Sequence, residues 1–177
     1  MPQAVITTAR LILRPPVFAD AEAIFASYGQ DPEVTHYLIW KPHTSLEDTR
    51  AFVQECIDAW AGGVRFPWVI TRATDGQLLG MFDTRIESGF KVSVGYVLAR
   101  EHWGNGYVPE ALRAVIDLFW TQPAIFRIWA VCDVDNPASA RVMEKAGMVR
   151  EGVLKRSILH PNISDEPRDA YCYAITR

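Results

Sequence analysis

The sequence predicts a mixed α/β fold, one sheet with helices packed on it, built as a single domain over residues 1–177. Strand-like and helix-like runs alternate along the whole chain, and no repeat or low-complexity segment interrupts them. Hydrophobic residues make up 49% of the chain and charged residues 22%, as in globular proteins of ordinary size. The elements are expected in the order β-α-α-β-β-β-α-β-α-β-β.

The first third of the chain is expected to form a strand and two helices. Residues Arg10–Arg14 are rich in leucine and isoleucine and precede two prolines, which predicts a strand that ends there. Apolar residues recur every three or four positions from Phe18 to Tyr28, as on one face of a helix. The segment Gln30–His43 is irregular and rich in aromatic residues. The capping box Thr44-Ser-Leu-Glu47 then opens a second helix, which ends at Gly62-Gly63.

The middle of the chain is expected to form antiparallel strands and one helix. Short links that contain glycine separate three strand-like runs, Phe66–Arg72, Gln77–Ile86 and Val92–Leu98. A helix follows Trp103–Tyr107 and carries Pro109 in its first turn, where a missing N–H costs little.

The last third is expected to add three strands and a helix. The run Phe126–Val134 is mostly apolar, which predicts a strand buried on both faces. Asn136-Pro137 opens a helix that runs to Lys145. The final two strands are predicted at Met148–Leu154 and Ala170–Thr176.

Composition argues against several classes of partner. The formal net charge is -3 and the pI about 5.8, so the whole-molecule charge gives no reason to expect a nucleic acid. Cys56, Cys132 and Cys172 lack the spacing of a zinc site or a disulfide framework, which indicates a reducing cytoplasm and no bound metal. Neither a secretion signal nor a run of roughly 18 apolar residues is found, so no membrane partner is expected.

The sequence Trp103-Gly-Asn-Gly-Tyr107 places two glycines directly before a helix. Such a turn exposes backbone N–H groups beside the positive end of the helix dipole, a combination that binds anions and above all phosphate. A dinucleotide fingerprint would have a third glycine at Pro109, and a nucleoside triphosphate loop would continue with Gly-Lys-Ser or Gly-Lys-Thr after Gly106. Nicotinamide cofactors, ATP and GTP are therefore disfavoured.

Several motifs in order resemble the GNAT N-acetyltransferase superfamily over the whole chain. They are the strand Val92–Leu98, the loop Trp103-Gly-Asn-Gly-Tyr107, and Asn136-Pro-Ala-Ser139 leading to Glu144-Lys-Ala-Gly-Met148. Arg10-Leu-Ile-Leu-Arg-Pro15, Tyr37-Leu-Ile-Trp40 and Val94-Gly-Tyr96 are similar to the RimJ/RimL branch, which acetylates the N-termini of ribosomal proteins.

This resemblance implies acetyl-coenzyme A as the co-substrate. Its pyrophosphate is expected on the backbone of the loop Glu101, His102, Trp103, Gly104, Asn105, Gly106 and Tyr107. The strands Val92–Leu98 and Phe126–Val134 are expected to splay, with the pantetheine arm bonded near Tyr96, Val97 and Leu98. Glu101 stands where the superfamily usually has Gln or Arg, so we expect its side chain to point away from the phosphates.

Acetyl transfer needs a neutral amine, donors for the oxyanion and a proton for the leaving thiolate. The RimJ/RimL pattern places Ser139 near the coenzyme sulfur as the candidate acid, and Asn136 as both helix cap and coenzyme contact. Both residues are also ordinary choices at a helix start, so Ser139 as acid and Ser139 as a merely structural or orienting residue stay open. Cys132, inside an apolar strand, is expected in the core rather than as a nucleophile.

No general base stands out. The family glutamates are replaced by Ser93 and by the stretch Arg156-Ser-Ile-Leu159. Asp83, Glu87 and His160 remain, each more typical of a surface or hydrogen-bonding residue, and water is the alternative proton acceptor.

The predicted acceptor site consists of Tyr37, Trp40 and Asp83. The sequence thus predicts a cytoplasmic acetyl-CoA-dependent N-acetyltransferase whose amine, a protein N-terminus or a small molecule, attacks the thioester directly in a ternary complex. The alternative is a coenzyme A-binding sensor module without catalysis. The resemblance also implies a possible homodimer.

Overall fold

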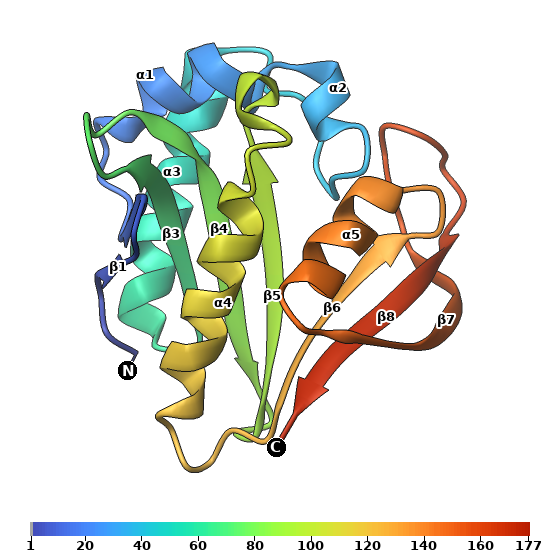
Figure 1. Ribbon diagram of the computed structural model, residues 1–177. Coiled ribbons are helices and arrows are strands. Elements are labelled where there is room, and N and C mark those ends of the chain that lie inside the picture. The colour runs from blue at the N-terminus through green and yellow to red at the C-terminus, as the bar shows by residue number, and fades with distance from the viewer. Residues whose placement is uncertain (1) are drawn as a thin grey trace.

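The computed structural model describes residues 2–177, arranged around one eight-stranded sheet with the strand order β1-β2-β3-β4-β5-β6-β8-β7 (Figure 1). The strands are β1 (Ile6–Thr7), β2 (Leu11–Arg14), β3 (Arg65–Arg72), β4 (Leu78–Glu87), β5 (Lys91–Leu98), β6 (Arg127–Asp133), β7 (Val149–Ile158) and β8 (Arg168–Thr176). The helices are α1 (Asp20–Ile24), η1 (Phe25–Gly29), α2 (Pro32–Thr35), α3 (Leu46–Gly62), η2 (Arg100–His102), α4 (Tyr107–Trp120) and α5 (Pro137–Lys145).

Helices cover both faces of the sheet, as Figure 1 shows, with α1 and α3 on one face and α4 on the other. The larger core joins α4 to the sheet through side chains such as Leu112, Phe119 and Trp68. The smaller core packs Ile24 of α1 and Val53 of α3 against the opposite face. Burial on both faces explains why the strands read as apolar runs rather than as an alternating pattern.

The predicted mixed α/β fold and its order of elements are confirmed, with local differences. The strand β1 and the one-turn helix α2 were not expected; Asp31 caps α2 by accepting hydrogen bonds from Glu33 and Val34. The helix predicted over Phe18–Tyr28 starts at Asp20, and its second half is the π-helix η1. The capping box of α3 lies one residue later than predicted, at Ser45 and Asp48.

The predicted splay of the central strands is confirmed. β5 and β6 run parallel and pair only at Lys91 with Arg127, Val92 with Ile128 and Ser93 with Trp129. Beyond these pairs the two strands diverge (Figure 1), while β5 stays paired to β4 up to Leu98. The inner edges of both strands are left without a ladder partner, an arrangement that is costly unless another group satisfies them.

One glycine allows β4 and β5 to approach closely at the wide end of the splay. A Cβ atom on Gly80 would lie 2.1 Å from the carbonyl oxygen of Val97. A larger residue would push the end of β5 away from β4. The position of the β5 edge therefore depends on this glycine.

In residues 2–177, no helix has both the length and the apolar character needed to cross a membrane.

Candidate active site

The opening between β5 and β6 forms a cavity of about 920 Å³. Its walls come from the diverging strands, the start of α4, the start of α5 and the segment after α2. Of the residues predicted to bind coenzyme, those that line it are Tyr96, Val97, Leu98, His102, Trp103, Gly104, Gly106, Tyr107, Asn136 and Ser139. One cavity thus brings together segments that are far apart in sequence: the glycine loop, the two diverging strands and the start of α5 with Ser139.

The glycine loop before α4 presents free backbone donors to this cavity. Gly104 and Gly106 have φ values of 78° and 76°, which side chains with a Cβ adopt only at a cost. Within residues 2–177, the N–H groups of Gly104, Asn105 and Gly106 donate to no protein acceptor. Within residues 2–177 no side chain caps α4, so the N–H groups of Tyr107 and Val108 are also free, whereas Glu110 donates to the Gly106 carbonyl oxygen. These donors fit a pyrophosphate at the positive end of the helix dipole.

The N-terminal strand region holds this loop in place. Arg10 donates from Nη1 to the Asn105 carbonyl oxygen at 3.0 Å, and its guanidinium lies over the Tyr107 ring. Glu110, in the first turn of α4, accepts hydrogen bonds from Arg10 and from the Thr8 hydroxyl. These contacts of Thr8 and Arg10 fasten the start of α4 to the N-terminal strand region.

The remaining loop residues face away from the cavity or brace the loop. The side chain of Glu101 is 65% exposed, lies 3.1 Å from His102 and does not line the cavity, as expected for a carboxylate beside phosphates. Asn105 turns its amide to the carbonyl oxygens of His102 and Trp103. Trp103 donates from Nε1 to the Leu98 carbonyl oxygen at 2.8 Å, which ties the loop to the end of β5.

Two hydroxyl groups from residues that line the cavity meet. The Ser139 Oγ lies 2.8 Å from the Tyr96 hydroxyl, across the gap between α5 and β5. The Asn136 side chain accepts the Ser139 N–H at 3.1 Å, so Ser139 is both a helix-start residue and a cavity residue. Burial raises the pKa of Tyr96, which keeps its hydroxyl protonated. The two hydroxyls therefore form one hydrogen-bonded pair that links α5 to β5.

Cys132 also lines the cavity, where it was expected only as a core residue. It is 4% exposed, and burial raises the pKa of its thiol to about 11. Because the thiolate is the nucleophile, this thiol is inert at neutral pH.

The predicted acceptor residues are not brought together. Tyr37 lines the cavity and donates from its hydroxyl to the Asp135 carbonyl oxygen at 2.8 Å. Trp40 lies outside the lining, with its ring 5.0 Å from that of His43. Asp83 also lies outside it, paired with Arg65 at 2.8 Å, and burial raises the pKa of its carboxyl.

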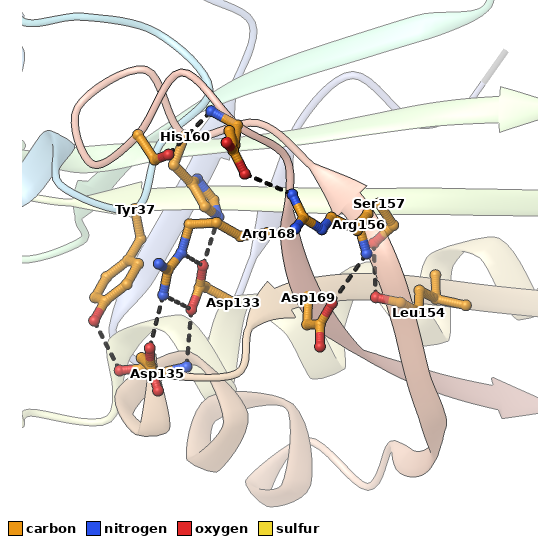
Figure 2. Close-up of polar contacts among 11 residues, drawn as sticks. Tyr37, Asp133, Asp135, Leu154, Arg156, Ser157, His160, Arg168 and Asp169 are labelled. Carbon is orange, nitrogen blue, oxygen red and sulfur yellow. Dashed lines mark hydrogen bonds and ion pairs between the residues drawn. The ribbon is translucent and has the colours of Figure 1, made fainter.

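A polar cluster at the cavity wall surrounds the buried Asp133 and His160 (Figure 2); the sequence offered His160 as a candidate base but did not predict the ion pairs of Asp133. Asp133 at the end of β6 accepts hydrogen bonds from Arg168 at 2.6 and 3.1 Å, and Arg168 also pairs with Asp135. Burial opposes ionisation of Asp133, but the Arg168 hydrogen bonds outweigh it and hold the pKa of that carboxyl below its usual value. His160 stands above Asp133, with its Nε2 3.5 Å from the Asp133 Oδ2, and lines the cavity.

Two basic residues on α5, Arg141 and Lys145, also line the cavity and were not predicted. Their spacing of four residues, on the same helix as Ser139, was a signal in the sequence. In residues 2–177, no group of three or more histidine, cysteine, aspartate or glutamate side chains is placed to hold a metal ion.

Comparison with known proteins agrees with this geometry. The family model for the acetyltransferase (GNAT) domain matches residues 10–149. The uncharacterized N-acetyltransferase YoaA of Bacillus subtilis is 33% identical over 98% of this chain and 97% of its own. The ribosomal-protein-serine acetyltransferase of Escherichia coli is 33% identical over 64% of this chain and 63% of its own. RimL, the ribosomal L7/L12 alpha-N-protein acetyltransferase solved with coenzyme A, superposes with a TM-score of 0.85 over 97% of each chain, at 23% identity.

The fold and the site define an acetyltransferase. The chain belongs to the GNAT acetyltransferase family, and the resemblance to the ribosomal-protein acetyltransferases within that family is confirmed.

Proposed function

We propose that the protein transfers the acetyl group of acetyl-CoA to a primary amine by direct attack in a ternary complex. The observation that carries this proposal is the parting of β5 from β6 after Ser93 and Trp129, which opens a cavity that continues to the free amides of Gly104–Gly106. A long substrate with an anionic end and a narrow polar arm matches that space.

In this proposal the pyrophosphate of acetyl-CoA binds the amides of Gly104–Gly106. The pantetheine arm follows the inner edge of β5 at Tyr96–Leu98 and satisfies its backbone groups. The thioester then lies near Ser139. Arg141 and Lys145 add positive charge at the cavity wall, which favours the phosphates.

In this proposal the protein accelerates acetyl transfer by positioning the amine beside the thioester and by stabilising the charges that form. Backbone N–H groups of β5 stabilise the oxyanion that forms when the amine attacks the thioester carbonyl carbon. The Ser139 and Tyr96 hydroxyls pass a proton to the departing sulfur. Direct attack is favoured over an acyl-cysteine intermediate because Cys132 has a pKa of about 11 and stays a thiol.

The acceptor amine is proposed to be a protein N-terminus or a small molecule. The relative named a ribosomal-protein-serine acetyltransferase supports a protein N-terminus. Tyr37 would contact the acceptor inside the cavity, whereas Trp40 and Asp83 would contact only an acceptor that extends beyond the lining. The alternative of a non-catalytic coenzyme A-binding module has less support, because the side chain of Glu101 points away from the cavity and does not oppose the phosphates.

Release of free thiol from acetyl-CoA tests the proposal. Wild-type protein is mixed with acetyl-CoA and a panel of amines: peptides that begin with serine, alanine or methionine, polyamines, amino acids and amine antibiotics. We expect thiol release that depends on at least one amine. Tight binding of acetyl-CoA in calorimetry without release on any amine would favour the binding module instead.

Three further predictions complete this proposal. One acetyltransferase domain spans residues 1–177. It acts in the cytoplasm, a location that the three unpaired cysteines and the relative named for a ribosomal protein support. The homodimer stays a prediction, and light scattering of the purified protein measures it.

A further inference from the structure

His160 is a buried histidine whose Nε2 lies 3.5 Å from the Asp133 carboxylate, a contact too long and poorly aligned to be a hydrogen bond. Its side chain is 1% exposed, and within residues 2–177 neither ring nitrogen has a hydrogen-bond partner. Buried polar atoms in native proteins nearly always have a hydrogen-bond partner. Two ring nitrogens without one, at the wall of a cavity, therefore point to a ligand that binds there. Since His160 lines the same cavity as Tyr96 and Ser139, that ligand shares the space of the thioester.

His43, which packs among Trp40 and Phe52, shows what a structural histidine looks like in this protein. His43 lies outside the cavity lining, and its Nδ1 is 2.7 Å from the Thr49 hydroxyl. Its ring packs against Phe52, with the centroids 5.6 Å apart. His160 has no such hydroxyl partner and faces the cavity instead.

Burial favours the uncharged ring of His160, because it lowers the pKa of the ring by more than the Leu38 backbone and the Asp133 carboxylate raise it. Asp133 is the nearest acid, but Arg168 already donates two hydrogen bonds to its carboxylate and donates one to Asp135 as well. Tyr37 meets the ring edge-on at 6.0 Å, and His36 follows α2 at the cavity wall. Burial lowers the pKa of His160, so a free lone pair is available at neutral pH. In Figure 2, Asp133 lies below this ring and Tyr37 lies below it to the left.

We propose that His160 is the general base that takes a proton from the acceptor ammonium. This inference rests on the proposed function, because it assigns the proton acceptor of the same reaction. The structure supports it by placing the unpaired imidazole in the cavity that holds Ser139 and Tyr96, beside Tyr37 of the acceptor side.

The protons and electrons of the step balance as follows. The acceptor enters as an ammonium ion, and His160 takes one proton from its nitrogen. The freed lone pair attacks the thioester carbonyl carbon and forms the C–N bond. When the C–S bond breaks, the sulfur leaves with its electron pair and receives the second nitrogen proton through Ser139 and Tyr96. His160 releases its proton to water, so each turnover yields one amide, one free thiol and one proton.

The pH dependence of kcat/KM for His160→Gln separates a base from a structural residue. With the wild type, the logarithm of kcat/KM should reach a plateau above the pKa of His160, which lies below the ordinary value of about 6.5. The variant reacts only with the fraction of acceptor that is already deprotonated in solution. The logarithm of its kcat/KM should therefore rise with pH, with a slope of one, up to the pKa of the acceptor. That pKa is about 8 for a peptide N-terminus and about 10 for an alkyl amine. At pH 7 with an alkyl amine, the loss should be at least about 100-fold and should shrink toward the acceptor pKa.

His43→Gln is the matched control and should keep the wild-type profile. A His160→Gln profile that is lowered equally at every pH, or not lowered, would overturn the proposal. Titration of the labelled His160 ring by NMR in wild-type protein needs no acceptor. A charged ring at pH 7 overturns the base assignment whether or not any amine releases thiol. A neutral ring supports it, and absence of thiol release with every amine would instead overturn the proposed function on which the assignment rests.

Discussion

The two hydroxyls of Ser139 and Tyr96 are the smallest unit on which the proposed chemistry depends. Their oxygens are 2.8 Å apart, and Ser139 stands on the first turn of α5, where a serine is also an ordinary helix-start residue. Only a functional measurement separates those two roles. The backbone cap of Ser139 comes from Asn136 and does not use the Ser139 hydroxyl, so removal of that hydroxyl leaves the cap intact.

Ser139→Ala should therefore bind acetyl-CoA normally and lose at least about tenfold in kcat, because the thiolate must leave without the proton path. Calorimetry measures the binding and thiol release measures the turnover. Tyr96→Phe should give a similar loss. Tyr28→Phe is the control: the Tyr28 residue is also buried, but within residues 2–177 its hydroxyl has no hydrogen-bond partner, and it belongs to the core beside α1 and α3. Unchanged turnover in Ser139→Ala would leave Ser139 with only its role at the helix start.

At the scale of elements, the loop before α4 combines a fixed backbone with free donors. Gly106→Ala forces a Cβ into a left-handed conformation and disturbs the amide row, so it should weaken acetyl-CoA binding by tenfold or more in calorimetry. Gly89→Ala is the matched control: Gly89 has φ 73° in the hairpin between β4 and β5, away from the cavity. It should cost similar stability, on the order of 1 kcal/mol, and leave binding unchanged. Equal losses of binding in both variants would contradict the anion site.

The end of β6 depends on the ion pair between Asp133 and Arg168. Asp133 is fully buried, so Arg168→Gln leaves a buried carboxylate unpaired and should lower the free energy of unfolding by about 3–5 kcal/mol in urea titrations. Arg156→Gln breaks an exposed pair with Glu166 and should cost less than about 1 kcal/mol. A loss from Arg168→Gln no larger than that from Arg156→Gln would contradict the buried role.

This ion pair also sets a pH dependence of stability. Because Arg168 holds the pKa of Asp133 below its usual value, the pair stabilises the fold above the unfolded-state pKa of about 3.9. That contribution is lost as the pH falls through the folded-state pKa. The difference in stability between wild type and Arg168→Gln should therefore be largest near neutral pH and shrink in acid.

At the scale of the whole molecule, the sequence patterns predicted the elements that carry strong local signals. Periodic apolar residues and capping residues located α3 and α4, and the glycine loop was identified from its place before a helix. The π-helix η1 and the short α2 were missed because their form depends on packing and on one capping side chain, Asp31.

The sequence offered His160 as one of three candidate bases but favoured a surface or hydrogen-bonding role for it, and its burial could not be predicted for a related reason. The loop that carries it is polar, which is typical of a surface segment. In the folded protein Asn162 donates to the carbonyl oxygens of Thr35 and Trp40, and so fastens this loop to the segment after α2. That contact joins residues more than a hundred positions apart and buries His160 at the cavity wall.

The cavity itself exists because two halves of the sheet meet along only three residue pairs between β5 and β6. A substrate bound between them would bridge the halves and satisfy their open edges. Amide hydrogen exchange with and without acetyl-CoA measures this most directly. We predict slower exchange at Gly104–Gly106 and along the inner edge of β5 from Tyr96 to Leu98, with little change in the hairpin at Gly89. Unchanged exchange at both segments, when calorimetry shows that acetyl-CoA is bound, would contradict the account.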